Sequence, residues 1–188
     1  MTRRNFINRV STLFAGLAGA NAAVQGDAQA QTVASAITPP PVAAATEIDV
    51  TPVKADKIVK LTLSDDEWKK RLSPLAYRVL RKEGTEPSGS SPLNGEKRKG
   101  TFVCAGCDLP VFTSEMKYES GTGWPSFFES IPAAFNTSTD FKLIYPRTEY
   151  HCARCGGHHG HVFTDGPKPT GKRWCNNGVS LKFVPAKA

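Results

Sequence analysis

Cys104-Ala105-Gly106-Cys107 and Cys152-Ala153-Arg154-Cys155 are the two segments that decide the fold of this 188-residue chain. Paired Cys-x-x-Cys segments are typical of structural zinc sites, in which four thiolates bind at about 2.3 Å and leave no position for water. Two disulfides or a redox pair are the alternative, and His151 or His159 could replace one ligand. The matched spacing favours one Zn²⁺ per chain, held by Cys104, Cys107, Cys152 and Cys155.

Short strand-forming runs dominate the chain after Thr101 and are separated by Gly and Pro. In the last run apolar and polar residues alternate, which predicts one buried face and exposes Ser180 and Lys182. The sequence therefore predicts a compact antiparallel β domain. The predicted runs are Thr101–Val103, Val111–Phe112, Phe141–Tyr145, His161–Phe163 and Val179–Val184.

Two short helices are predicted before these strands. Ser64 and Glu67 form a capping box, so a helix should run from there to about Leu72. The pair Ser73-Pro74 begins a second helix, because proline suits the first helical position, and Gly84 is the expected cap at its end.

The first 58 residues have the composition of an export signal followed by a tether. Arg3-Arg4, a weakly apolar run and Ala28-Gln29-Ala30 occur in the order of a signal peptide and resemble a twin-arginine signal. A disordered basic tail is the alternative. We expect export to the bacterial periplasm by residues 1–30, a flexible Ala- and Pro-rich tether over 31–58, and the folded domain over 59–188. Because the resemblance implies export in the folded state, the metal could be loaded before export.

The charge of the chain is mildly positive. Lys and Arg exceed Asp and Glu by 24 − 17 = 7. A surplus of this size does not by itself indicate nucleic-acid binding, so we expect none. No stretch reaches about 18 strongly apolar residues, so no membrane span is expected.

Cys175 is the cysteine that remains if a metal takes the other four. A lone cysteine is often a small buried apolar residue, but the neighbours of this one are polar. The guanidinium of Arg173 would lower the pKa of a nearby thiol and favour the reactive thiolate. Candidate proton donors lie close together in the sequence, at His158, His159 and His161.

Trp124 lies in the segment Gly121–Phe127, where glycines surround an aromatic residue. Such a segment predicts a backbone bend that presents the indole. A core tryptophan at a turn is an equal alternative on this motif alone.

Six ordered motifs together resemble the methionine-R-sulfoxide reductases of the B type, from about Leu63 to Phe183. They are Cys104-x-x-Cys107, Glu119–Phe127, Cys152-x-x-Cys155, His158–Phe163, Asp165–Pro167 and Arg173–Asn177. The resemblance implies a mainly β (α+β) fold of two small, bent antiparallel sheets with N-terminal helices, and a structural zinc site opposite the active site. It also implies reduction of methionine-R-sulfoxide, free or in proteins, through a cysteine sulfenic acid, and so the repair of oxidised proteins.

The same resemblance implies a role for each site residue. Cys175 matches the nucleophile that attacks the sulfoxide sulfur, and Trp124 matches the aromatic wall that receives the substrate methyl group. Arg173 matches the arginine beside the nucleophile, and we expect Phe127 to line the substrate site. The remaining expected catalytic residues are His158, His161 and Asn177.

Thr122 departs from the pattern of many family members, which have a resolving cysteine at this position. With the other four cysteines on zinc, Cys175 has no internal disulfide partner, so an external thiol, either small or thioredoxin-like, must regenerate it. We also expect a monomer. Further departures from the family pattern occur at His159, Asn176 and Gly178.

A zinc-binding module without catalytic activity is the competing hypothesis. It would account for the four paired cysteines and for the mild positive charge. It leaves Trp124, the histidines and Cys175 without a role.

Overall fold

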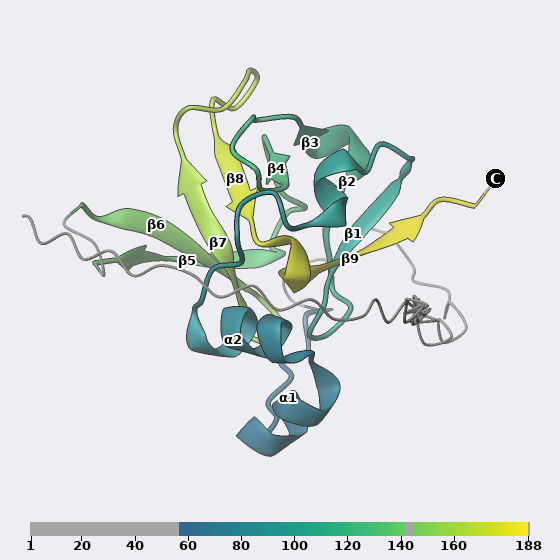
Figure 1. Ribbon diagram of the computed structural model, residues 1–188, viewed down its shortest axis with the longest axis vertical. Helices are drawn as coiled ribbons and strands as arrows, with labels where there is room; N and C mark the ends of the chain where they lie inside the picture. The colour runs from purple at the N-terminus through teal and green to yellow at the C-terminus, as the bar shows by residue number, and fades with distance from the viewer. Residues whose placement is uncertain (1–56, 142–144, 188) are drawn as a thin grey trace, which may run out of the picture. The chain divides into compact units, whose positions relative to one another are not determined.

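The computed structural model describes residues 57–141 and 145–187, which form two antiparallel sheets with two short helices beside them (Figure 1). This arrangement confirms the predicted mainly β fold. The predicted signal peptide and nearly all of the tether lie outside the described residues. Among the residues that the structure describes, no helix combines the length and apolarity needed to cross a membrane.

Helix α1 (Asp65–Arg71) begins as predicted. The Ser64 hydroxyl accepts a hydrogen bond from the Glu67 backbone, and the Glu67 carboxylate accepts one from the Ser64 N–H at 2.8 Å. The capping box is therefore complete, and it satisfies N–H groups that have no partner within the helix.

Helix α2 (Pro74–Lys82) buries one apolar face but ends differently from the prediction. The residue with left-handed backbone conformation is Glu83, at φ 52°, rather than Gly84. The Gly84 N–H donates to the carbonyl of Arg78 at 3.0 Å, so the chain has already turned by Glu83. As a result the Glu83 carboxylate lies near the histidine cluster, 3.9 Å from His151 Nε2.

The smaller sheet has the strand order β2-β1-β9 and the larger sheet the order β3-β4-β8-β7-β6-β5. The strands of the smaller sheet are β1 (Gly100–Cys104), β2 (Pro110–Thr113) and β9 (Leu181–Pro185). The strands of the larger sheet are β3 (Lys117–Tyr118), β4 (Ser126–Phe127), β5 (Phe135–Asp140), β6 (Arg147–Cys152), β7 (His158–Phe163) and β8 (Arg173–Asn176). Aromatic rings from both sheets fill the core, where Phe112 stacks on Phe127 with 3.9 Å between ring centroids.

The predicted strand over Phe141–Tyr145 is wrong at both of its ends. Strand β5 ends at Asp140 and β6 begins at Arg147, and these two residues pair across the hairpin. Phe141 and Tyr145 lie between the strands and are 75% and 77% exposed. The buried Asp140 carboxylate accepts a hydrogen bond from Arg147 at 2.6 Å, so this ion pair marks the end of the hairpin ladder. The residues between Phe141 and Tyr145 lie outside the described part of the chain.

The last predicted strand begins later than its alternation suggested. Residues Gly178–Ser180 form the 3-10 turn η4, and β9 starts at Leu181. The buried Glu86 carboxylate accepts hydrogen bonds from the backbone N–H groups of Gly178 at 2.5 Å and Val179 at 3.0 Å. Because these bonds hold the turn, Ser180 is buried rather than exposed.

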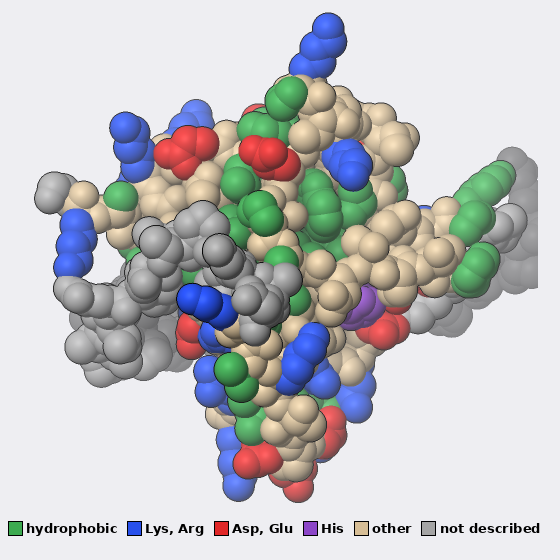
Figure 2. All heavy atoms as spheres, turned by 180° about the vertical axis from the view of Figure 1, so that it is seen from behind, with side chains coloured by type: hydrophobic (Ala, Val, Ile, Leu, Met, Phe, Trp, Pro, Cys, Tyr) green, Lys and Arg blue, Asp and Glu red, His purple; other side chains and the backbone are tan. Residues whose placement is uncertain are grey.

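Charged side chains of both signs share the surface. On the face shown in Figure 2, Lys and Arg side chains are spread among Asp and Glu side chains rather than gathered in one basic patch. This distribution is in keeping with the mild net charge of the sequence.

Candidate active site and metal centre

The four paired cysteines meet in one buried cluster, because both Cys-x-x-Cys turns lie at the ends of neighbouring hairpins. Cys104 Sγ lies 3.7 Å from Cys155 Sγ, and Cys107 Sγ lies 3.5 Å from Cys152 Sγ. A disulfide requires about 2.05 Å, whereas four thiolates on one tetrahedral ion at about 2.3 Å lie roughly 3.8 Å apart. The cluster is therefore a site that can hold a metal ion, and it is not a pair of disulfides.

The protonation of these thiols also favours a bound cation. Hydrogen bonds among the thiols, chiefly from Cys107, together with burial raise the pKa of Cys104 well above its ordinary value. Hydrogen bonds from the same neighbours, Cys104 first, lower the pKa of Cys155. Four adjacent buried thiols cannot all ionise alone, and a metal ion would allow them to.

His159 lies beside the cysteine cluster and links it to the strand of Cys175. The buried ring places Nε2 3.3 Å from Cys104 Sγ and Nδ1 3.1 Å from the side-chain oxygen of Asn176. Tyr150 donates a hydrogen bond to the same oxygen at 2.9 Å. His159 and Asn176, the two buried polar residues that depart from the family pattern, are therefore in contact through a hydrogen bond. Each satisfies a polar atom of the other that burial removes from water.

Cys175 lies at the other end of this link, in a cavity of about 130 Å³. The indole of Trp124 forms part of the wall and is fixed by a hydrogen bond from its Nε1 to the Glu86 carbonyl at 3.2 Å. The cavity lining contains the predicted site residues Trp124, His161, Cys175 and Asn177, together with Thr85, Arg147, Gly160, Phe163 and Asn176.

Phe127 and His158 do not line this cavity. Phe127 is fully buried in the core, stacked on Phe112. His158 is 2% exposed and packs behind His161, with 5.5 Å between the ring centroids.

A β-bulge places both histidines on one face of the larger sheet. In a regular strand His158 and His161 would point to opposite faces, because they are three positions apart. The pairing of β6 with β7 shifts between Tyr150 and His151, so that Gly160 opposes Tyr150 while His158 opposes His151. The extra residue, His159, turns into the core, and His158 and His161 share the face of Glu149.

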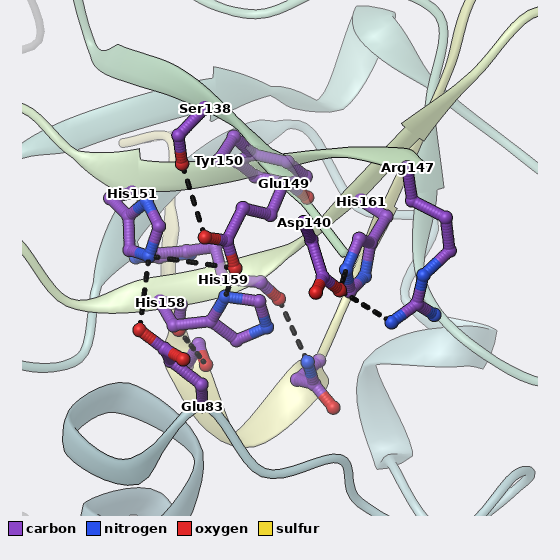
Figure 3. A network of polar contacts seen from close by, with 12 residues as sticks. Glu83, Ser138, Asp140, Arg147, Glu149, Tyr150, His151, His158, His159 and His161 are labelled. Carbon is purple, nitrogen blue, oxygen red and sulfur yellow. Dashed lines mark hydrogen bonds and ion pairs between the residues drawn. The ribbon is translucent and has the colours of Figure 1, made fainter. Parts of the chain in front are cut away.

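Each of these histidines has a carboxylate neighbour (Figure 3). His161 Nε2 lies 2.8 Å from Asp140 Oδ2, and His158 Nδ1 lies 3.5 Å from Glu149 Oε2. Burial lowers the pKa of His161, and the hydrogen bond to Asp140 opposes that shift. Sequence reasoning missed both carboxylates, since only strand register shows that they face the histidines.

Cys175 faces His161 directly across the β7–β8 pairing. Burial raises the pKa of the Cys175 thiol, while the Arg173 guanidinium and a hydrogen bond to the Thr122 hydroxyl act to lower it. Arg173 is itself held by two hydrogen bonds of 2.8 Å to the Asp165 carboxylate. Thr122, at the position where the resemblance implies a resolving cysteine in many family members, thus places a hydroxyl in contact with the thiol.

Asn177 holds the strands around the cavity together. Its side chain accepts a hydrogen bond from the Glu86 N–H and donates one to the His159 carbonyl, each at 2.9 Å. Next to it, a Cβ on Gly178 would lie 1.9 Å from the Ser91 hydroxyl oxygen, so this position has no room for a side chain.

A half-buried thiol facing a carboxylate-paired histidine, in an aromatic-walled cavity beside a four-cysteine cluster, is the arrangement of an enzyme with a cysteine nucleophile. The SelR domain matches residues 72–185. The chain is 50% identical to a peptide methionine sulfoxide reductase MsrB of Leptospira interrogans over 121 residues, 64% of this chain and 92% of the relative. It is 46% identical to an MsrB of Agrobacterium fabrum over 127 residues, covering 67% and 94% of the two chains.

The chain therefore belongs to the SelR domain family, the methionine sulfoxide reductases of the B type. It is an oxidoreductase that reduces methionine-R-sulfoxide in proteins, and the predicted family and activity are confirmed. The hypothesis of a zinc module without catalytic activity is thereby set aside.

Gly160 is the position at which the bulge meets the strand of Cys175. A Cβ there would lie 2.0 Å from the Cys175 carbonyl oxygen, so Gly160→Ala must push β8 away from His161. We expect kcat/KM for an R-sulfoxide substrate to fall about 100-fold, since a displacement of about 1 Å has that effect on aligned groups. Gly95→Ala is the matched control, because its Cβ meets nothing within 4 Å. Wild-type activity in Gly160→Ala would contradict the role of the bulge.

Proposed function

We propose that Cys175 is the nucleophile that takes the oxygen atom from methionine-R-sulfoxide. The observation that supports this most strongly is the direct pairing of Cys175 with His161 at the cavity that Trp124 walls. The Cys175 thiolate bonds to the sulfoxide sulfur while the sulfoxide oxygen is protonated. The hydroxyl then moves to the Cys175 sulfur as the S–O bond and the new S–S bond break, which leaves Cys175 as a sulfenic acid and releases methionine.

His161 is the proposed proton donor, because it faces Cys175 and is oriented by Asp140 through a 2.8 Å contact. His158 acts from behind His161 and is oriented by Glu149. Trp124 receives the substrate methyl group, since sulfur–aromatic contacts are worth about 0.3–1.5 kcal/mol and suffice to orient a small group. Arg173 favours the thiolate, Asn177 positions the strands, and Phe127 supports the site from the core.

An external thiol is the proposed reductant. The other four cysteines are buried in the metal cluster, and Thr122 stands where an internal partner would be needed. The sulfenic acid then reacts with an incoming thiol to give a mixed disulfide and water, and a second thiol releases Cys175. We further propose that the enzyme acts as a monomer, because one chain contributes every residue of the site.

Zinc is the proposed metal of the cysteine cluster. Four thiolates suit Zn²⁺, which has no redox chemistry of its own and would serve here to hold the two hairpins together. The sulfur–sulfur distances of 3.5 and 3.7 Å support this assignment.

Replacing the nucleophile should abolish activity without disturbing the metal. In Cys175→Ser we expect no measurable reduction of a peptide R-sulfoxide with dithiothreitol, because the hydroxyl is a far weaker nucleophile than the thiolate. Metal content should match the wild type, since the cysteine cluster is intact. Substantial activity in Cys175→Ser would refute the assignment.

The Thr122 hydroxyl should contribute to the pH dependence of the reaction, beside burial of the thiol and the charge of Arg173. It acts to lower the Cys175 pKa, so Thr122→Val should raise that pKa. The acid limb of the kcat/KM profile should then move to higher pH, because the thiolate forms later as pH rises. Thr137→Val removes an exposed hydroxyl in β5 and should leave the profile in place. An unchanged or acid-shifted limb in Thr122→Val would count against this account.

Removal of one metal ligand should unfold the domain. Protein purified without added metal should contain about one equivalent of zinc. The Cys104→Ser variant should contain none and should show no cooperative thermal transition, because structural zinc supplies folding free energy. Elemental analysis and thermal denaturation test both expectations. A folded, metal-free Cys104→Ser protein would show that the cluster does not depend on a metal.

We also propose that residues 1–30 direct export to the bacterial periplasm by the twin-arginine route and that residues 31–58 form a tether. The support is the order of Arg3-Arg4, the apolar run and the Ala28-Gln29-Ala30 site. Intact mass of the periplasmic protein should correspond to a chain that starts at Gln31. Replacing both arginines by lysine should retain the precursor in the cytoplasm, and unchanged localisation would exclude the route.

A further inference from the structure

We propose that Glu149, His151 and His158 form a second site, which binds a divalent transition-metal ion such as Zn²⁺. The ligand atoms of these three residues all lie within 4.8 Å of one another. Two imidazoles and one carboxylate are a donor set that suits zinc, whereas Mg²⁺ and Ca²⁺ favour oxygen ligands. Strands β6 and β7 supply the ligands, and the bulge brings His158 opposite His151.

The distances between the donor atoms fit a shared ion better than hydrogen bonds. Glu149 Oε2 lies 3.5 Å from His158 Nδ1 and 3.9 Å from His151 Nε2. Hydrogen bonds between such groups are about 2.7–3.2 Å long. Two ligands of a tetrahedral ion with bonds of about 2.0–2.1 Å lie roughly 3.3–3.4 Å apart, so closure needs only small side-chain adjustments.

The carboxylate of Glu149 is held in the orientation that a metal ligand requires. Its Oε1 accepts a hydrogen bond from the Ser138 hydroxyl at 3.1 Å, which fixes the group from β5, the strand paired with β6. The other oxygen, Oε2, is buried and makes no hydrogen bond within the described residues. A cation bound between this buried carboxylate oxygen and the two imidazoles would give the oxygen the partner that it lacks among these residues.

Glu83 can supply the fourth ligand from the end of α2. Its Oε1 lies 3.9 Å from His151 Nε2, and its side chain is 41% exposed. This placement follows from the left-handed turn at Glu83, which directs the carboxylate at His151 (Figure 3). Because the Glu83 side chain is partly exposed, an ion can enter from solvent at this end of the site.

A neighbouring cluster of Asp140, Glu149 and His161 is the weaker candidate. The Asp140 carboxylate already contacts His161 at 2.8 Å and Arg147 at 2.6 Å. The guanidinium would repel a cation there, so the ion is expected at His151.

Occupation of this site would inhibit the enzyme, a consequence that rests on the proposed function. An ion on His158 Nδ1 holds that ring and takes Glu149 away from its orienting role. Inhibition should be reversed by a chelator too weak to strip the four-cysteine cluster.

Metal binding tests the site without any activity measurement. The experiment uses full-length Cys175→Ser protein that already contains one equivalent of zinc, so that the Cys175 thiol cannot act as a ligand for the added ion. Equilibrium dialysis against micromolar Zn²⁺ should add a second equivalent. A Co²⁺ titration should give visible d–d bands without a thiolate charge-transfer band, because the ligands are nitrogen and oxygen.

Variants of the peripheral ligands decide the assignment. His151→Asn should weaken binding of the second ion by more than about 100-fold, and Glu83→Gln should weaken it less. The control Glu115→Gln removes an exposed carboxylate outside the cluster and should change nothing. Circular dichroism checks that each variant is folded. The proposal is overturned if the parent protein binds no second ion, or if both His151→Asn and Glu83→Gln bind it as tightly as the parent.

The regulatory consequence has its own readout. With Cys175 restored, His151→Asn should match wild-type activity in metal-free buffer and lose sensitivity to micromolar Zn²⁺. Equal inhibition of both proteins would place the inhibitory ion elsewhere. A protein without reductase activity would refute the proposed function, while the dialysis result would still decide the metal site.

Discussion

The contact among four buried cysteine thiols is the constraint on which the rest of this structure depends. It joins the turn after β1 to the turn after β6, and so fixes the smaller sheet against the larger one. His159 extends the constraint, because its ring contacts Cys104 at one end and Asn176, the neighbour of Cys175, at the other. The cluster and Cys175 are therefore parts of one packed unit, although they lie on different sides of the sheet.

The bulge in β7 positions the histidines of the candidate active site. It sends His159 into the core and leaves His158 and His161 on the outer face, where Glu149 and Asp140 meet them. Because the bulge adds one residue to the strand, His158 and His161 share one face although they are three positions apart, and His159 between them packs in the core. The same register shift places His158 opposite His151, so that these two imidazoles and the Glu149 carboxylate lie close enough together to bind a metal ion.

Local patterns in the sequence predicted the parts of the fold that local interactions determine. The capping box at Ser64 and the two Cys-x-x-Cys turns need only neighbouring residues, and both were predicted correctly. The end of β5 and the turn at Gly178–Ser180 were not, because Arg147 and Glu86 hold them from elsewhere in the fold. Motif resemblance predicted roles for Cys175, Trp124 and the histidines, and the structure brings these residues close together. The carboxylate partners of the histidines follow from strand register, which a single sequence does not show.

The central claim is that one thiol performs the chemistry and that no other cysteine of the chain takes part. A single turnover without reductant, followed by mass spectrometry of the trapped protein, tests it most directly. The account predicts one methionine released per chain and a gain of one oxygen atom located on Cys175 as a sulfenic acid. Loss of two hydrogen atoms instead, with Cys175 in a disulfide to any cysteine of the cluster, would contradict it.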